Sequence, residues 1–309
     1  MSNPFVTETL DQRIAALAPS SDLLLPEGAG PHPVVIQFHG CGGKKLHQPR
    51  WAEVARKAGW AAIVSDSYAH RRINRFEAYA TVCTGLQLWG RERAGDLYAM
   101  LAWVRRQAWA DPARVALAGW SHGAWTVLDA MALQPGRDAE RETRLAGIPD
   151  EPLAGLSGAF ILYPWQGIGA LAPQRGLRID VPVQAIVGTA DSVVGGRNVA
   201  RVLTGMKTPG QAIKVELFEG ATHAFDEIEA QDWRVKYDPD LTARAHGMYA
   251  AHLHFEIRKN IQIGPYQTSF ARDYSNYFSP RQFIAQRRQL KGGDTAVVPV
   301  DTFSGQGAA

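Results

Sequence analysis

One short stretch constrains the fold of this chain more than any other. Residues 115–118 form an apolar run, and the pentapeptide Gly-Trp-Ser-His-Gly at residues 119–123 follows it, ahead of a helix-forming segment. This is the order that a nucleophile elbow requires, because a buried strand delivers Ser121 to its carboxyl end and the next helix begins there. Gly119 and Gly123 flank the serine where a tight turn leaves no room for side chains. The pattern predicts that Ser121 is a nucleophile at the edge of a sheet.

Apolar, β-branched runs alternate with amphipathic segments along most of the chain. Strands are predicted where a short apolar run ends in a turn signal, at residues 22–26, 34–38, 61–64, 115–118, 159–163, 183–187 and 213–217. Helices are predicted where apolar residues recur every three to four positions, from about residues 51, 97, 122, 199 and 239 onward. The alternation indicates an α/β fold: a doubly wound, mostly parallel sheet with helices on both faces.

Composition excludes several classes of function. The chain has 309 residues, 46% of them apolar and 20% charged, with a formal net charge of +3. No dense Lys/Arg run favours nucleic acid or an anionic membrane as a partner. No signal peptide is recognisable, and no apolar run has the length of a membrane span. We therefore expect a cytoplasmic protein with a small-molecule substrate, and the sequence leaves room for a homodimer.

Two further loops complete a catalytic constellation with Ser121. The predicted strand 183–187 runs into Asp191, and the predicted strand 213–217 is followed by His223. Both side chains are expected at the carboxyl edge of the sheet, where open α/β sheets bind ligands. The order Ser, Asp, His is that of the α/β-hydrolase triad. His223 would act as the general base and Asp191 would orient its imidazole.

An acyl-transfer serine also needs hydrogen-bond donors for the oxyanion. One predicted donor is the backbone N–H of His122, directly after the nucleophile. The other is expected in the glycine-rich segment 39–43, which follows the first central strand. Cys41 and Gly42 are equal candidates there, and a plain strand-to-helix turn is the simpler interpretation of the same segment.

With these residues in place, the chain resembles an α/β-hydrolase of the dienelactone hydrolase type over roughly residues 20–258. The resemblance rests on the order and spacing of five short motifs, at residues 39–43, 64–71, 119–123, 188–191 and 220–225. It implies hydrolysis of a small ester or lactone without a metal or an organic cofactor. Founding members of that family use a cysteine nucleophile, whereas the elbow here carries Ser121, which favours an esterase-like branch. In the family an arginine can hold a substrate carboxylate; Arg71 is the candidate, and an ion pair is its simpler role.

The chain has two cysteines, Cys41 and Cys83. Both are expected in loops after neighbouring strands, so they could meet above the sheet in a disulfide. Two free, partly buried thiols are the simpler interpretation, and they fit a cytoplasmic protein better.

The hydrolase domain is predicted to span residues 1–258, with a C-terminal extension at 259–309 that is partly disordered. The segment from His252 onward also resembles the end of a lysostaphin-type zinc peptidase, in which a pair of histidines serves the metal. His252 and His254 alone cannot hold zinc, which takes at least three protein ligands. His252 moreover falls on the inner stripe of the last predicted helix. We therefore expect no metal site.

Three classes of function compete. The first is a serine hydrolase of small carboxylic esters or lactones. The second uses the same triad as a peptidase, thioesterase or acyltransferase, and the third is a non-catalytic binding protein. The segment 133–159 is too short for a large lid, which favours an open pocket, although loops after other strands could cover the site.

Overall fold

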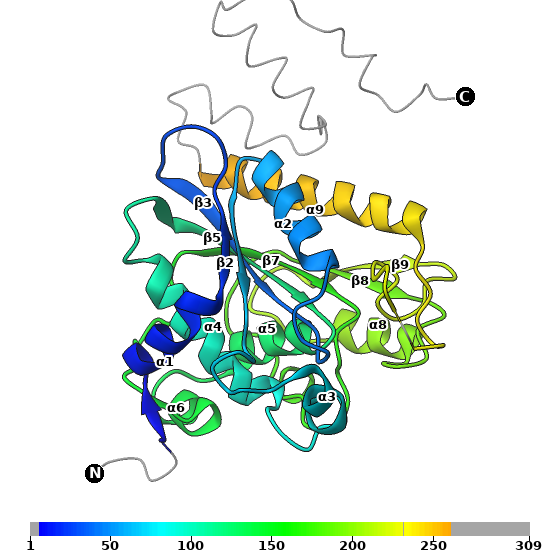
Figure 1. Cartoon of the computed structure of the whole chain (residues 1–309), viewed down its shortest axis with the longest axis horizontal. Coiled ribbons are helices and arrows are strands. Elements are labelled where there is room, and N and C mark those ends of the chain that lie inside the picture. Colours follow the sequence, from blue (N-terminus) through cyan, green and yellow to red (C-terminus); the bar gives the residue numbers. More distant parts are fainter. Residues whose placement is uncertain (1–5, 231, 261–309) are drawn as a thin grey trace, which may run out of the picture. The chain divides into compact units, whose positions relative to one another are not determined.

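The computed structural model describes residues 6–230 and 232–260, and a seven-stranded sheet runs through its centre (Figure 1). All but one of its strands run parallel, and only the edge strand β2 is antiparallel to its neighbour. The strand predictions are confirmed, with differences of one to two residues at most ends. In spatial order the strands are β2 (Asp22–Leu24), β4 (Ala61–Ser65), β3 (His32–Phe38), β5 (Ala110–Trp120), β7 (Leu156–Leu162), β8 (Val183–Gly188) and β9 (Lys214–Phe218).

Helices cover both faces of this sheet, as the alternating pattern predicts. On one face the side chains of Ile36 and Leu117 belong to a core cluster with apolar residues of the helices packed there. These helices are α1 (Leu10–Leu17), α4 (Gly90–Val104), α5 (His122–Ala132) and α8 (Gly196–Thr204). On the other face lie α2 (His47–Lys57) and α9 (Pro239–Asn260) (Figure 1). There the ring of Tyr249 packs on Trp51 and Phe160 at centroid distances of 5.2 and 5.1 Å.

The structure corrects the predicted inner stripe of the last helix. Apolar spacing predicts Leu241, Ala245, Met248 and Phe255 for that stripe. Ala245 is fully buried as predicted, but Leu241 and Met248 are only half-buried. Tyr249 is fully buried instead, and its hydroxyl accepts a hydrogen bond from the amide of Gln37 at 3.2 Å. A buried tyrosine bound to a buried glutamine has a polar group on each side, so hydropathy periodicity gives no signal for it. His252 does face inward, with 7% of its surface exposed.

Several short elements escaped the sequence analysis because each is too short to show a period. They are the strands β1 (Glu8–Thr9) and β6 (Leu145–Ala146), which pair with each other, and the helical turns α3 (Arg75–Glu77), η2 (Ala78–Val82), α6 (Arg137–Thr143) and α7 (Ala172–Arg175). The eight-residue helix α1 was missed as well.

The described residues up to Leu253 form one compact unit. The predicted extension at 259–309 lies almost entirely outside the described residues, so that boundary stays a prediction. Within residues 6–230 and 232–260, no helix combines the length and apolarity needed to cross a membrane.

Candidate active site

Ser121 occupies the turn between β5 and α5 with φ 52° and ψ −110°. A non-glycine residue with positive φ is strained, and such strain is common where a side chain must be presented for chemistry. The turn is possible because its flanking residues have no side chains. A Cβ on Gly123 would lie 1.9 Å from the carbonyl oxygen of Phe38, and one on Gly119 would lie 2.6 Å from the nitrogen of Ala124. The predicted elbow geometry is therefore present.

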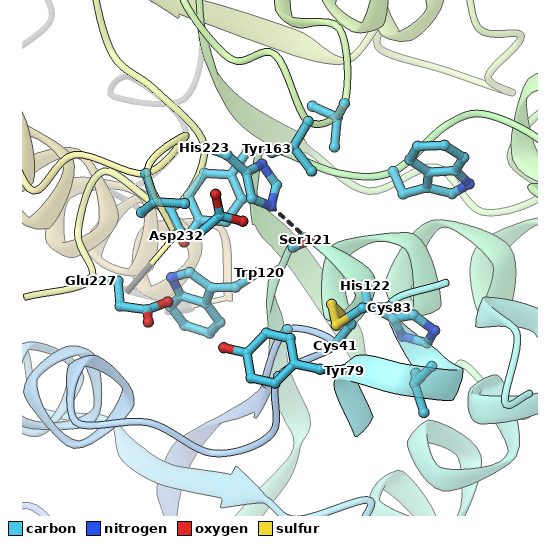
Figure 2. A pocket seen from close by; sticks show the side chains of 18 of the residues that line it. Cys41, Tyr79, Cys83, Trp120, Ser121, His122, Tyr163, His223, Glu227 and Asp232 are labelled. Carbon is cyan, nitrogen blue, oxygen red and sulfur yellow. Dashed lines mark hydrogen bonds between the residues drawn. A yellow bond between two sulfur atoms is a disulfide. The ribbon is translucent and has the colours of Figure 1, made fainter. Parts of the chain in front are cut away.

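The three predicted triad residues form one hydrogen-bonded chain. The Nε2 atom of His223 lies 3.0 Å from the Oγ atom of Ser121, and its Nδ1 atom lies 2.8 Å from Oδ2 of Asp191. Figure 2 shows the imidazole of His223 pointing toward Ser121, with the hydrogen bond between them drawn as a dashed line. A carboxylate only accepts hydrogen bonds, so Nδ1 carries the proton and Nε2 is free to accept the serine proton.

The loop after β8 fixes the carboxylate of Asp191. Its Oδ1 atom accepts backbone hydrogen bonds from Val193 and Val194 at 2.9 and 3.1 Å, and only 3% of the residue is exposed. Both oxygens are thus occupied, one by the backbone and one by the imidazole. A carboxylate held in this way keeps the imidazole in one orientation and one tautomer.

The two predicted sources of oxyanion donors meet beside Ser121. His122 is the first residue of α5, so its N–H has no acceptor within the helix. On the other side, the chain turns after β3, where the N–H of Gly43 donates to the carbonyl of Gly40 at 3.2 Å. Cys41 and Gly42 lie inside this turn and line the same pocket as Ser121 and His122. Either can supply the second donor, so both stay candidates.

A buried arginine that the sequence analysis did not single out connects these two sources. Arg93 on α4 is fully buried, and its Nη1 donates to the carbonyl oxygen of His39 at 2.7 Å and to Nδ1 of His122 at 3.2 Å. Its Nε donates to Oγ of Ser67 at 2.7 Å. Burial and the nearby Arg93 charge lower the pKa of His122 to about 3, so its ring is neutral. No sequence motif marked Arg93, because its partners are distant along the chain.

A buried carboxylate organises the opposite side of the site. Asp226 accepts hydrogen bonds from the indole N–H groups of Trp51 and Trp120 at 2.8 and 3.1 Å, and from the hydroxyl of Tyr163 at 2.6 Å. The Tyr163 ring in turn packs against the imidazole of His223 at 4.7 Å. Burial first, and then the Asp226 charge, raise the pKa of Tyr163 well above its ordinary value, so it stays a donor.

Ser121 opens into a pocket of about 570 Å³. None of the described residues between 133 and 159 lines it, consistent with the prediction that this segment is no lid. Much of the wall comes instead from loops after other strands, at residues 79–89, 163–168, 193–194, 224–230 and 232–235. Three large apolar side chains of these loops line the pocket, Trp89, Trp165 and Ile168, and Trp125 of α5 lines it as well.

Cys41 and Cys83 form a disulfide, so the interpretation as two free thiols is wrong. Both residues line the pocket, and the bond ties the turn after β3 to the end of η2. In Figure 2 the bridge lies on the other side of Ser121 from His223. Disulfides are rare in the cytosol, so this bond counts against the cytoplasmic location, which stays a prediction.

Arg71 does not serve the site as the resemblance implied. Its guanidinium forms two hydrogen bonds of 2.8 Å with the buried carboxylate of Asp96 and a third of 2.6 Å with the carbonyl of Ser67. It is not among the residues that line the pocket. The guanidinium of Arg71 is thus bound by acceptors within the protein. The simpler interpretation of Arg71 as part of an ion pair is correct.

His252 of the last helix lies outside this site. It packs against the ring of Phe160 at 5.7 Å and does not line the pocket. Among the residues that the structure describes, no group of three or more His, Cys, Asp or Glu side chains is placed to hold a metal ion.

The sheet, the elbow and the loop order define the α/β-hydrolase class of fold. The dienelactone hydrolase family model matches residues 21–140 and 152–254, and the chain belongs to that family. This result confirms the resemblance inferred from the motifs. No curated protein matched the chain.

Solved structures with the same fold include hydrolases with several activities. Esterase 2 of Thermogutta terrifontis, phosphonylated by cyclosarin, is 18% identical with a TM-score of 0.54, over 77% of this chain and 88% of that one. A dienelactone hydrolase-like promiscuous phosphotriesterase from metagenomic libraries is 19% identical with a TM-score of 0.52, over 75% and 90%. A Klebsiella pneumoniae protein with a provisional dienelactone hydrolase name is 16% identical with a TM-score of 0.57, over 75% and 91%. At these identities they show the fold alone.

Proposed function

We propose that this protein hydrolyses small carboxylic esters or lactones through an acyl-enzyme on Ser121. The observation that carries the proposal is the continuous hydrogen-bonded chain from Ser121 through His223 to Asp191, at 3.0 and 2.8 Å, beside an accessible pocket. Membership in a family of hydrolases supports it.

The reaction follows from the geometry of this chain of residues. His223 removes the Ser121 proton as the oxygen attacks the ester carbonyl carbon, and the resulting imidazolium is stabilised by Asp191. The oxyanion accepts hydrogen bonds from the N–H of His122 and from that of Cys41 or Gly42. His223 then protonates the departing alcohol and later activates water, which releases the acid and regenerates Ser121.

The pocket supports substrates of modest size. About 570 Å³ is in the range of small-molecule sites and holds an ester with short substituents on both sides. The apolar walls suit the hydrocarbon parts of such a substrate, whose burial is favourable.

The decisive experiment compares hydrolysis of p-nitrophenyl acetate and butyrate by the wild type and by Ser121→Ala. We expect kcat to fall by roughly a thousandfold or more in the variant, because the nucleophile is gone. Ser157→Ala is a matched control, since Ser157 is a buried serine on β7 that donates to the carbonyl of Val115 and is not among the pocket residues. An arm with EDTA tests for a metal requirement.

Other outcomes would redirect the proposal. Equal rates in the wild type and Ser121→Ala would exclude Ser121 as the nucleophile for this reaction. Labelling of Ser121 by a fluorophosphonate without ester turnover would favour a peptidase, thioesterase or acyltransferase on the same triad. Failure to label would favour a non-catalytic binding protein.

A further inference from the structure

The two sides of the proposed oxyanion hole come from separate parts of the chain. One donor follows β3, in the turn that contains Cys41 and Gly42, and the other is the first N–H of α5 at His122. Backbone donors stabilise an oxyanion only when they are held in place before charge develops. Something must therefore fix these segments relative to each other.

Arg93 bridges them directly. A single nitrogen, Nη1, donates both to the carbonyl oxygen of His39, two residues before Cys41, and to the ring of His122. The tautomer of His122 agrees with this assignment. Its Nε2 lies 2.8 Å from the carbonyl of Leu88, which can only accept, so Nε2 carries the proton and Nδ1 accepts from Arg93.

A third contact connects the same guanidinium to the end of β4. Arg93 donates through Nε to Oγ of Ser67, while the N–H of Ser67 lies 3.3 Å from Nε2 of His39. The other ring nitrogen of His39 lies 2.7 Å from the carbonyl of Gly40, so the ring donates there and accepts from Ser67. Arg93 thus reaches segments at the carboxyl ends of three strands.

The charge of Arg93 is not neutralised by a contacting acid. The buried carboxylate of Asp96 is bound by Arg13 and Arg71 instead, and Arg93 takes part in none of the ion pairs found among the described residues. Its Nη2 has no hydrogen-bond partner in the described part of the chain. Burying a charge without a counterion is costly, and guanidinium stays protonated in proteins. The positive charge of Arg93 is therefore buried beside the site without an acid in contact with it.

We propose that Arg93 is a positioning residue of the oxyanion hole, which holds the turn after β3 and His122 together and places a positive charge behind both donors. The proposal rests on the proposed function, because it assumes that an oxyanion forms at Ser121. The charge becomes most favourable in the transition state, when negative charge develops on the far side of the donors.

The test compares the full-length wild type with Arg93→Met, Arg93→Lys and Arg13→Met. Arg13→Met is the matched control, since Arg13 is also a buried arginine, 6% exposed, but binds Asp96 and Glu8, and none of these three residues lines the pocket. Arg93→Met removes both the charge and the hydrogen bonds, and kcat is expected to fall roughly a hundredfold with KM changed less than about threefold. Arg93→Lys keeps the positive charge but lacks the planar set of guanidinium N–H donors, so we expect a kcat between those of the wild type and Arg93→Met.

Two further measurements separate positioning from simple structural damage. An arylboronic acid, which forms a tetrahedral adduct with an active-site serine, should lose affinity for Arg93→Met by about the same factor as kcat. NMR titration should show a higher pKa for the His122 ring in Arg93→Met and an unchanged one in Arg13→Met, because a neighbouring cation lowers it in the wild type.

The outcomes that overturn the proposal are specific. A folded Arg93→Met variant with the kcat of the wild type would overturn it. So would a variant in which only KM changes, or a fall in kcat that is equally large in Arg13→Met. If Arg93→Met does not fold, Arg93→Lys decides, and a wild-type kcat there would exclude the positioning role. If the wild type hydrolyses no ester, the proposed function fails, and the His122 titration still reports whether Arg93 controls that ring.

Discussion

At the scale of single residues, the chemistry of this site depends on which lone pairs are already used. One oxygen of Asp191 accepts from two backbone N–H groups and the other from His223, so the carboxylate is held in one orientation. The imidazole therefore presents Nε2 to Ser121 in its basic form. Two predictions test the hydrogen bonds of single carboxylates in and beside the site.

The first concerns Asp191. Asp191→Asn keeps the shape of the side chain but can turn its NH₂ toward the imidazole, which would favour the wrong tautomer of His223. We expect kcat for p-nitrophenyl acetate to fall by roughly 10³- to 10⁴-fold with little change in melting temperature. Asp111→Asn, at a partly exposed position outside the pocket, serves as the control. A loss of less than tenfold would contradict an orienting role for Asp191.

The second concerns Asp226, which accepts from three neutral donors. Asp226→Asn replaces one accepting oxygen by a donating NH₂ group, so at least one buried indole or phenol donor loses its partner. We expect the free energy of unfolding to fall by roughly 1–3 kcal/mol. Urea titration followed by tryptophan fluorescence measures the change. An unaltered unfolding midpoint would show that these hydrogen bonds contribute nothing to stability.

At the scale of elements, the pocket depends on loops rather than on an inserted domain. The turn after β3 and the segment from Tyr79 to Trp89 both line the pocket, and the Cys41–Cys83 disulfide joins them. The bond links positions 42 residues apart, so it restricts the unfolded chain as well as the folded loops. The same loop carries both candidates for the second oxyanion donor.

This bond yields a third prediction. A Cys41→Ser/Cys83→Ser variant should lose roughly 2–4 kcal/mol of stability. Its kcat should also fall, because the turn that contains Cys41 and Gly42 is no longer bonded to the segment from Tyr79 to Trp89. Melting curves and ester hydrolysis with and without dithiothreitol measure both effects. Dithiothreitol should impair the wild type and leave the double variant unchanged, and an effect on both proteins alike would contradict the assignment to this bond.

At the scale of the whole molecule, one buried carboxylate connects separate parts of the chain. Asp96 on α4 receives hydrogen bonds from Arg13 on α1 and from Arg71 in the segment after β4. Burial alone would raise the pKa of Asp96, but Arg71 and Arg13 outweigh it and hold that pKa well below its ordinary value. The unfolded chain thus binds this proton more readily than the folded one does.

The fourth prediction follows from that difference. Stability from Asp96 is fully present above the unfolded pKa of about 4 and is lost as the pH falls toward the lower folded pKa. Asp96→Asn should be destabilised by roughly 3–5 kcal/mol at neutral pH, because two buried guanidinium groups lose their partner. Urea unfolding between about pH 7 and pH 3 measures this effect. The difference in the free energy of unfolding between the wild type and the variant should become smaller as the pH falls. A difference in the free energy of unfolding that does not change with pH would contradict the coupling between stability and the protonation of Asp96.

The sequence by itself determined the sheet, the strand-to-helix alternation and the elbow. These depend on local patterns, apolar runs of strand length and glycines around Ser121, and such patterns need no knowledge of distant partners. The triad of Ser121, Asp191 and His223 could be predicted for the same reason, because each of these residues follows a strand that the local pattern predicts. The family motifs added the dienelactone hydrolase assignment.

Only the tertiary structure decided which polar groups meet. It assigned Arg71 to an ion pair with Asp96, joined Cys41 to Cys83, and placed Arg93 between His39 and His122. Each of these contacts joins residues more than 20 positions apart, at positions with no periodic signal. A guanidinium or a thiol selects its partner by distance and direction in the folded chain, and spacing along the sequence contains neither.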